Sequence, residues 1–313
     1  MGIKQVIKNL TNVLTDRQYL SLRYYLEFRR PIHWENPRTF NEKMQWLKLY
    51  DRDPLYPRMV DKYSSKQLVS DAIGEEYIIP CLGIWNSFEE IDFGKLPPRF
   101  VLKTTHDCGG VLVCRNKSDF VQETDSGWTL TERGAAASRI MNENLKKDYY
   151  FQSREWPYHH VPHRILAEEY VENPGQDCLI VYKVFCFGGE PELIQVIQDD
   201  KSDLESIDYF DCGWNLLPLR QNYPNSTRHL EKPEVLEEML ALSRTLAANR
   251  AFIRVDWYIV EGKLKFSEFT LYSDAGMAPF VPESWDLHLG EKILLPQCPS
   301  SDRGHRQKGI AKR

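Results

Sequence analysis

The stretch that most constrains the fold of this chain is the lysine- and glycine-containing segment 100–115. An apolar run leads to Lys103, a polar turn follows over 104–110, and a second apolar run leads out. Two short β-prone runs around a turn that ends in Gly-Gly predict a β-hairpin. Because Gly109 and Gly110 have no Cβ, we expect positive φ there, with backbone N–H groups that face an oxyanion such as phosphate and a charge added by Lys103. An ordinary hairpin with an exposed lysine is the alternative.

The composition sets broad limits on the kind of protein and its partners. With 42% hydrophobic and 27% charged residues, the 313-residue chain resembles ordinary soluble globular proteins. Its net charge of -5 argues against a nucleic-acid partner, because proteins that bind nucleic acids generally carry an excess of Lys and Arg that neutralises the phosphates. Seven cysteines without a C-x-x-C pair argue against a disulfide framework or a zinc ribbon. We find no secretory signal and no membrane span, so a cytoplasmic location is expected; the basic, aromatic N-terminal helix also allows contact with the inner face of a membrane.

Apolar spacing predicts a helical N-terminal region followed by a mixed body. Helices are predicted over 14–30, from Phe40 behind a Thr39–Glu42 capping box, and over 55–73. In the body, further helices are predicted over 132–147 and 233–249, and β-strands over 164–171, 179–187, 192–198, 252–260 and 263–271. The predicted segments are a helical region, 1–75, a first lobe with the hairpin, 76–165, a second lobe, 166–296, and a disordered tail, 297–313.

Three charged residues, Lys183, Asp256 and Glu268, lie in the middle of otherwise apolar strands. A buried charge is costly unless an opposite charge meets it, and carboxylates on paired strands can hold a divalent cation. A two-residue turn at 261–262 would put Asp256 and Glu268 on opposite faces, whereas a three-residue loop ending in a left-handed Gly262 puts them on one face. We expect the three-residue loop. Structural acids on a polar sheet face are the alternative.

An acidic segment, Glu168-Glu169-Tyr170-Val171, ends the strand that precedes Asn173-Pro174-Gly175. Its backbone can pair with the edge of a base, while an acidic side chain hydrogen-bonds to a ribose or an amine. The segment is therefore a candidate hinge for a nucleotide.

The order of these features resembles the ATP-grasp fold and, more narrowly, the TupA-like ATP-grasp family of bacterial cell-surface polysaccharide and teichuronopeptide biosynthesis. The resemblance spans roughly residues 30–290 as an ordered set of short motifs. These motifs are NPRTFNEK at 36–43, DKY at 61–63, GIW at 83–85, FVLKTTH at 100–106, REWPY at 154–158, LAEEY at 166–170, YKVFCF at 182–187, RVD at 254–256 and FSEFT at 266–270.

The resemblance implies an α+β fold in which two α/β lobes with antiparallel sheets grip ATP and Mg²⁺. Many ATP-grasp enzymes have Glu-x-Asn at the second metal position, where this chain has Glu268-Phe-Thr270, which puts a second Mg²⁺ in doubt. The resemblance implies that Lys103, Lys183 and the segment from His106 to Gly109 and Gly110 bind the phosphates. It implies adenine binding by Glu168, Glu169, Tyr170 and Val171, and ribose binding by Asp177 or Glu172. It also implies Mg²⁺ binding by Asp256, Glu268 and Thr270, and stabilisation of a phosphate or acyl phosphate by Arg254.

The activity implied by the resemblance is ATP-dependent ligation of a carboxylate to an amine. A uronic-acid-like carboxylate of a surface glycan or its precursor would form an acyl phosphate, which an amino acid or amine would convert into an amide. Lys103, Lys183 and Arg254 would be the catalytic residues. A glycosyltransferase is the first alternative, although the chain's Asp-x-Asp, Asp51-Arg-Asp53, lies in the helical region. A non-catalytic nucleotide- or glycan-binding protein and a sugar kinase are further alternatives.

Overall fold

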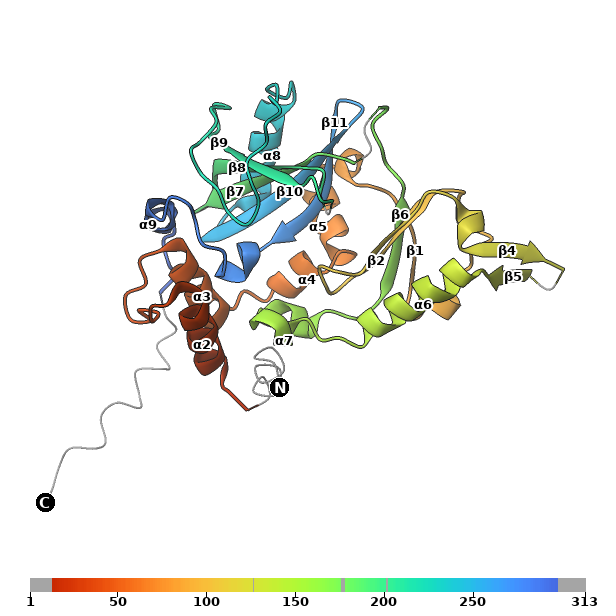
Figure 1. Ribbon diagram of the computed structural model, residues 1–313, viewed down its shortest axis with the longest axis horizontal. Helices are drawn as coiled ribbons and strands as arrows, with labels where there is room; N and C mark the ends of the chain where they lie inside the picture. Colours follow the sequence, from red (N-terminus) through yellow and green to blue (C-terminus); the bar gives the residue numbers. More distant parts are fainter. Residues whose placement is uncertain (1–12, 126, 176–177, 201, 298–313) are drawn as a thin grey trace, which may run out of the picture.

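The computed structural model describes residues 13–125, 127–175, 178–200 and 202–297. Within these ranges the chain forms one antiparallel sheet of four strands, one of five strands and a separate two-stranded hairpin, with helices packed around them (Figure 1). This arrangement confirms the predicted α+β class with antiparallel sheets. None of the helices in the described ranges is long and apolar enough to cross a membrane.

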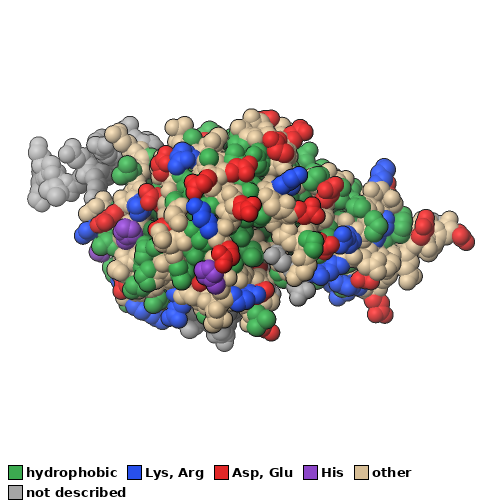
Figure 2. Space-filling model, turned by 90° about the horizontal axis from the view of Figure 1, so that it is seen from above, with side chains coloured by type: hydrophobic (Ala, Val, Ile, Leu, Met, Phe, Trp, Pro, Cys, Tyr) green, Lys and Arg blue, Asp and Glu red, His purple; other side chains and the backbone are tan. Residues whose placement is uncertain are grey.

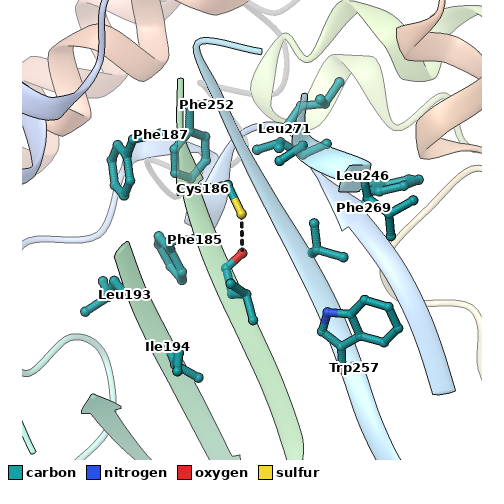
Figure 3. Packing of buried hydrophobic residues seen from close by; sticks show 14 of the residues in the cluster. Phe185, Cys186, Phe187, Leu193, Ile194, Leu246, Phe252, Trp257, Phe269 and Leu271 are labelled. Carbon is teal, nitrogen blue, oxygen red and sulfur yellow. Dashed lines mark hydrogen bonds between the residues drawn. The ribbon is translucent and has the colours of Figure 1, made fainter. Parts of the chain in front are cut away.

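The five-stranded sheet has the order β11-β10-β7-β8-β9. Side chains alternate between its two faces. One face packs against α8 (Leu236–Ala247), where the Trp257 indole N–H donates to Ser243 Oγ at 2.9 Å. The other face carries Phe185, and the close view shows the packing around these strands (Figure 3). The strands are β7 (Val181–Phe187), β8 (Glu190–Gln198), β9 (Ser206–Phe210), β10 (Phe252–Val260) and β11 (Lys263–Thr270).

Helix α3 (Phe40–Tyr50) joins the N-terminal region to this sheet. The predicted capping box is confirmed, since Thr39 Oγ1 accepts from the Glu42 N–H and the Glu42 side chain accepts from the Thr39 N–H. The cap starts the helix at Phe40, whose ring packs edge-on against Phe252 at a centroid distance of 5.1 Å and an interplanar angle of 85°. Aromatic pairs in this geometry add about 0.5–1.5 kcal/mol beyond their buried area.

The four-stranded sheet contains the predicted glycine hairpin. Its order is β1-β6-β2-β3, with β1 at Cys81–Trp85, and the hairpin is formed by β2 (Phe100–Thr104) and β3 (Val111–Cys114). Helix α6 (Glu132–Leu145) runs beneath this sheet, and the hairpin of β4 (Val121–Thr124) and β5 (Gly127–Leu130) projects beyond it (Figure 1). Strand β6 (Ile165–Glu169) pairs with both β1 and β2. The chain therefore leaves the four-stranded sheet after Glu169, and the lobe boundary between 165 and 166 stays a prediction.

The helix predicted over 55–73 is interrupted. Helix α4 (Tyr56–Val60) ends at Asp61, whose backbone is extended, and α5 (Ser64–Ile73) begins three residues later. The Asp61 carboxylate accepts from the Tyr63 N–H at 3.1 Å and from Ser64 Oγ at 2.7 Å, which satisfies donors at the start of α5. The interruption turns the Lys62 backbone toward the neighbouring sheet, where its N–H donates to the Thr105 carbonyl at 3.1 Å.

The turn between β10 and β11 differs from our expectation, although its consequence was predicted correctly. Val260 pairs with Lys263, so the turn has two residues, and both Glu261 (φ 49°) and Gly262 (φ 75°) are left-handed. Asp256 nevertheless lies opposite Glu268, because a β-bulge shifts the register between Asp256 and the next residue of β10. A bulge restores the shared face that a two-residue turn alone would destroy.

The N-terminal helix α2 (Asp16–Phe28) buries its apolar face within the chain. Tyr19, Leu20 and Tyr24 form a small core with Ile32 and Trp34. Contact with a membrane surface stays a prediction, and residues 1–12 and 298–313 lie outside the described ranges. The remaining elements are α7 (Tyr150–Ser153), α9 (Ser284–Lys292) and the 3₁₀ turns η1 (Glu75–Tyr77), η2 (Phe88–Glu90), η3 (Lys117–Asp119), η4 (Trp156–His160) and η5 (Ser273–Gly276).

Candidate active site

A cavity of about 550 Å³ lies between the two sheets. Strands β2 and β3 line one side, and β7 and β10 line the other through Val181 and Tyr258. The predicted hinge forms the wall that connects them, through Glu168, Glu169, Tyr170 and Val171. On the face seen in Figure 2 acidic and basic side chains are interspersed.

The Glu168 carboxylate joins two lysines at the inner end of the cavity. Lys103 Nζ lies 2.5 Å from Glu168 Oε2, and Lys66 Nζ, from α5, lies 2.8 Å from Oε1. Glu168 is only 4% exposed. Burial raises the pKa of this carboxyl group, but the two lysines outweigh burial and lower it to about 2. The side chain of Glu168 therefore positions cations, which differs from the ribose or amine contact that we considered for the acidic hinge.

Asp256 and Glu268 lie opposite each other on β10 and β11. Arg254 holds Asp256 through two hydrogen bonds, from Nε to Oδ1 at 2.7 Å and from Nη2 to Oδ2 at 2.8 Å. Arg254 Nη2 also donates to Thr270 Oγ1 at 2.9 Å. Lys183 Nζ lies 3.7 Å from Asp256 Oδ2. The expected set of side chains is brought together, with Arg254 bound to Asp256 and Thr270.

Glu268 faces a group of cations that includes one residue absent from our predictions. Burial raises the pKa of Glu268, but the charges of Lys62, Lys183, Arg254 and Lys103 outweigh it and lower the pKa below its ordinary value. Among these cations Lys62 acts most strongly on Glu268. The Asp61-Lys62-Tyr63 motif was the available signal, but the predicted continuous helix gave no reason for Lys62 to leave the helical region.

The loop between β2 and β3 is closed by a side chain and not by left-handed glycines. Asp107 Oδ1 accepts from the Gly110 N–H at 3.1 Å and from the Thr104 hydroxyl. Neither Gly109 nor Gly110 has a positive φ, so that expectation was wrong. Glycine is still required at 110, because a Cβ there would lie 1.7 Å from Thr104 Oγ1. Lys62 Nζ donates to the carbonyl of Asp107, which ties the loop to the helical region.

His106 is oriented away from the cavity. Its ring is fully buried, and Nε2 lies 3.2 Å from the Asn144 carbonyl and 3.1 Å from the Lys147 carbonyl at the end of α6. Carbonyls only accept, so Nε2 carries the hydrogen and donates. The ring stacks on His163 at 3.7 Å. The His106 ring therefore packs beneath the loop, and phosphate binding by the segment from His106 to Gly110 stays a prediction.

The two candidate ribose ligands have different outcomes. Glu172 lines the cavity, and its carboxylate accepts from Arg99 Nη1 at 2.5 Å. Asp177 lies outside the described residues. The site therefore offers Glu172 at the expected end of the cavity, and the role of Asp177 stays a prediction.

Asp256 and Glu268 are the carboxylates that could hold Mg²⁺ in this site. Mg²⁺ is usually bound by one or two carboxylates together with substrate phosphates, and Asp256 and Glu268 supply two carboxylates on neighbouring strands. Thr270 Oγ1 already accepts from Arg254. Among the described residues, no group of three or more His, Cys, Asp or Glu side chains is placed to hold a metal by itself. Phosphate oxygens would therefore complete the coordination.

Comparison with known proteins identifies a family. A family profile described as TupA-like ATPgrasp matches residues 42–294, and a search of curated proteins finds no match. The fold is similar to that of D-alanine–D-alanine ligase from Bacillus anthracis complexed with ATP, at 16% identity over 68% of this chain and 55% of that one, with a TM-score of 0.37. It is also similar to D-alanine–D-alanine ligase from Helicobacter pylori, at 14% identity over 82% of this chain and 69% of that one, with a TM-score of 0.39. The chain thus spans about half the length of the Bacillus anthracis ligase. Because the profile covers most of the sequence, including the cavity, the lysines and the paired carboxylates, the chain belongs to the TupA-like ATPgrasp family.

Proposed function

We propose that this protein is an ATP-dependent carboxylate–amine ligase that produces ADP. The observation that carries the proposal is the pairing of Asp256 with Glu268 next to the charges of Lys62, Lys103 and Lys183. Two carboxylates beside several lysines suit a metal-bound polyphosphate, because the acids bind the cation and the lysines neutralise phosphate oxygens.

We place the nucleotide along the cavity. Its base would lie against the apolar walls that include Val101 and Val181 and pair with the hinge backbone at 169–171. Its phosphates would lie at the inner end, where the charges of Lys103, Lys183 and Lys62 act on Glu268. Lys66 would act through Glu168, because Lys66 and Lys103 pair with the same Glu168 carboxylate.

Asp256 and Glu268 would hold Mg²⁺, which when bound shields the phosphate oxygens and orients the terminal phosphate. The chain's own contribution is to keep these carboxylates ionised and in place. Arg254 fixes both oxygens of Asp256 from one side, and the surrounding lysines keep the pKa of Glu268 low. A carboxyl group that is always ionised at neutral pH can serve as a ligand throughout the reaction.

The reaction itself needs positioning and charge neutralisation more than a protein nucleophile. An oxygen of the substrate carboxylate attacks the γ-phosphorus of ATP, the bond to ADP breaks, and an acyl phosphate forms. Lys103, Lys183 and Lys62 would neutralise the charge that spreads over the phosphate oxygens. An amine then attacks the acyl carbon and releases phosphate, which leaves an amide.

We propose a uronic-acid-like carboxylate of a bacterial surface polysaccharide, or of its precursor, as the acceptor. Membership in the TupA-like family supports this substrate class. The alternative glycosyltransferase reading has weaker support, because both acids of Asp51-Arg-Asp53 have local structural roles. Asp51 accepts from the Tyr56 hydroxyl at 2.7 Å, and Asp53 accepts from the Leu55 N–H at 2.9 Å. The supply of ATP makes the cytoplasm the compartment for this reaction.

Hydroxylamine trapping tests the function without knowledge of the natural amine. The protein is incubated with Mg-ATP, hydroxylamine and each of a panel of free and UDP-linked uronic acids, and hydroxamate and ADP are measured. We expect equal amounts of hydroxamate and ADP with at least one uronic acid, and neither product with Asp256→Asn. Release of UDP without ADP would contradict the proposal and favour a glycosyltransferase.

A further inference from the structure

The loop between α7 and η4 supplies a buried carboxylate that the function proposed above does not use. Glu155 is 5% exposed, and its Oε1 accepts from Ser153 Oγ at 2.7 Å. No other group in the described part of the chain donates a hydrogen bond to this carboxylate. Burying a carboxylate with so few donors is costly, so its place in the fold needs an explanation beyond packing.

The lysine next to Glu155 does not satisfy it directly. Lys48 is fully buried, and its ammonium donates to the Ala275 carbonyl at 2.7 Å, to the Ser153 carbonyl at 2.9 Å and to Gln45 Oε1 at 3.2 Å. Three acceptors use all three hydrogens of an ammonium group. Lys48 therefore offsets part of the negative charge of Glu155 while the carboxylate keeps its capacity to accept hydrogen bonds from a ligand.

The surroundings of Glu155 connect it to the reacting end of the site. It interacts electrostatically with Arg254 on β10 and with Asp274 in η5. Its charge also acts on Cys108, in the loop above the phosphate end of the cavity, and on Tyr149. Cys108 and Asp274, whose charges interact with that of Glu155, are both solvent-exposed. Burial raises the pKa of Glu155 above its ordinary value, which makes its carboxylate a better proton acceptor.

A second observation points to a missing ligand. The hydroxyl group of Tyr272 is buried and has no hydrogen-bond partner among the described residues, although the charge of Glu155 acts on it. A buried hydroxyl without a partner carries a desolvation cost of about 1–3 kcal/mol. The Lys48 ammonium, which donates to the Ser153 carbonyl, also lies 5.9 Å from the centroid of the Tyr272 ring. The unpartnered hydroxyl and the incompletely satisfied carboxylate therefore flank the same lysine, and together they suit a small ligand that both donates and accepts hydrogen bonds.

The turn beside this pair is strained and held in place. Asp274 (φ 48°) and Ala275 (φ 54°) are both left-handed, which costs non-glycine residues of order 1–3 kcal/mol each. Buried Gln45 and Lys48 of α3 hold the turn by donating to the Ala275 carbonyl at 3.0 and 2.7 Å. The result is a second carboxylate, Asp274, fixed near Glu155 and Arg254.

We propose that Glu155, assisted by Asp274 and the Tyr272 hydroxyl, receives the ammonium group of the amine substrate and takes one of its protons. This inference rests on the ligase function proposed above and assigns a primary amine, such as that of an amino acid or amino sugar, to this end of the site. The ammonium gives one proton to the Glu155 carboxylate. The nitrogen lone pair then forms the bond to the acyl carbon, the bond from that carbon to the phosphate oxygen breaks, and the second proton leaves with phosphate.

The test measures binding of primary amines to the Mg-ATP complex by thermal shift. Wild-type protein is saturated with Mg-ATP and titrated with the twenty amino acids, ethanolamine and glucosamine, and with the N-acetylated form of each. We expect at least one primary amine to stabilise the complex and its acetylated form not to. Glu155→Gln is expected to weaken binding of that amine at least about tenfold, while the response of the variant to Mg-ATP stays within twofold of the wild-type response.

Glu123→Gln, in the projecting β4–β5 hairpin, is the matched control and should bind both ligands as wild type does. Should Glu155→Gln fail to fold, Glu155→Asp keeps the charge with a shorter reach and is expected to show a smaller loss of amine binding. An equal amine response in wild type and Glu155→Gln, or no response to any amine in protein that binds Mg-ATP, would overturn this inference. Failure of wild type to respond to Mg-ATP would instead overturn the proposed function.

Discussion

The pKa values of two buried glutamates in this protein are shifted in opposite directions. Glu168, 4% exposed, bonds directly to Lys66 and Lys103, and its pKa falls to about 2. Glu155, 5% exposed, also has a lysine nearby, yet its pKa rises because of burial. The difference is where the lysine hydrogens go: Lys48 donates to carbonyl groups and not to Glu155. Burial therefore does not decide whether a carboxyl group is a fixed anion or a proton acceptor; its direct partners do.

This difference matches the chemistry that we propose for the two ends of the site. The nucleotide end needs permanent charges, and Glu168 keeps two lysines in place beside the cavity. The amine end needs a group whose proton content can change, and Glu155 is kept short of direct cationic partners. The predictions below break or sharpen this contrast, from the largest expected effect to the smallest.

Glu168→Gln should remove the anion that two largely buried lysines, Lys66 and Lys103, share. Leaving buried charges without a partner typically costs about 3–5 kcal/mol, so the free energy of unfolding at pH 7 should fall by that amount. Urea unfolding measures it. Glu172→Gln, on the exposed side of the hinge, is the control and should change the free energy by less than about 0.5 kcal/mol. A loss below about 1 kcal/mol for Glu168→Gln would show that the ion pairs of Glu168 contribute little to the free energy of unfolding.

The ion pairs of Glu168 with Lys66 and Lys103 also predict a pH dependence of stability. The pKa of Glu168 lies near 2 in the folded protein against an ordinary 4.5, so its ionised form favours the folded state. The contribution, about 3 kcal/mol, is fully present above pH 4.5 and is lost as the pH falls through 2. Urea unfolding of wild type and Glu168→Gln between pH 7 and pH 3 should therefore converge as the solution becomes more acidic. Parallel curves would contradict the assigned pKa.

Lys62→Met tests the cation that sequence reasoning missed. Loss of a charged hydrogen-bond donor to phosphate costs about 1.5–3 kcal/mol, so Mg-ATP should bind about tenfold to a hundredfold more weakly. Isothermal titration calorimetry measures the affinity. Lys95→Met, which removes an exposed lysine that pairs with Asp92, should bind Mg-ATP as wild type does. Equal Mg-ATP affinity of Lys62→Met and wild type would show that Lys62 only supports the loop at Asp107.

Glu155→Gln should have the smallest effect on stability. A raised pKa means that ionised Glu155 disfavours the folded state, and this cost is present above the pKa of the folded protein and absent below the ordinary value. Replacing it with a neutral amide at pH 7 should change the free energy of unfolding by less than about 1 kcal/mol. A loss as large as that of Glu168→Gln would show that Glu155 is a structural partner of Lys48.

The sequence predicted the strands, the antiparallel hairpins and the shared face of Asp256 and Glu268, because alternation and turn residues are local signals. It did not reveal the bulge next to Asp256 that produces the shared face, since no residue pattern marks which position will be bulged. It also missed Lys62 and did not reveal where the His106 ring packs. Both depend on packing between segments far apart in the chain: Lys62 reaches the loop at Asp107, and His106 reaches the end of α6.

Glu155 illustrates what local patterns cannot give. The motif 154–158 is part of the family resemblance, but its importance arises from contacts with α3 and η5 that bring Lys48 and Asp274 to the same place. Such a site becomes visible only when three distant segments are assembled.

The most direct test of the central claim is calorimetric titration of wild type and Asp256→Asn with Mg-ATP and, separately, with UDP-glucuronic acid. We predict that wild type binds Mg-ATP in a magnesium-dependent manner and that Asp256→Asn binds it at least about tenfold more weakly, because the amide supplies no anionic ligand. Binding of UDP-glucuronic acid without any binding of Mg-ATP, or equal Mg-ATP affinity in both proteins, would contradict the assignment of this cavity as an ATP site.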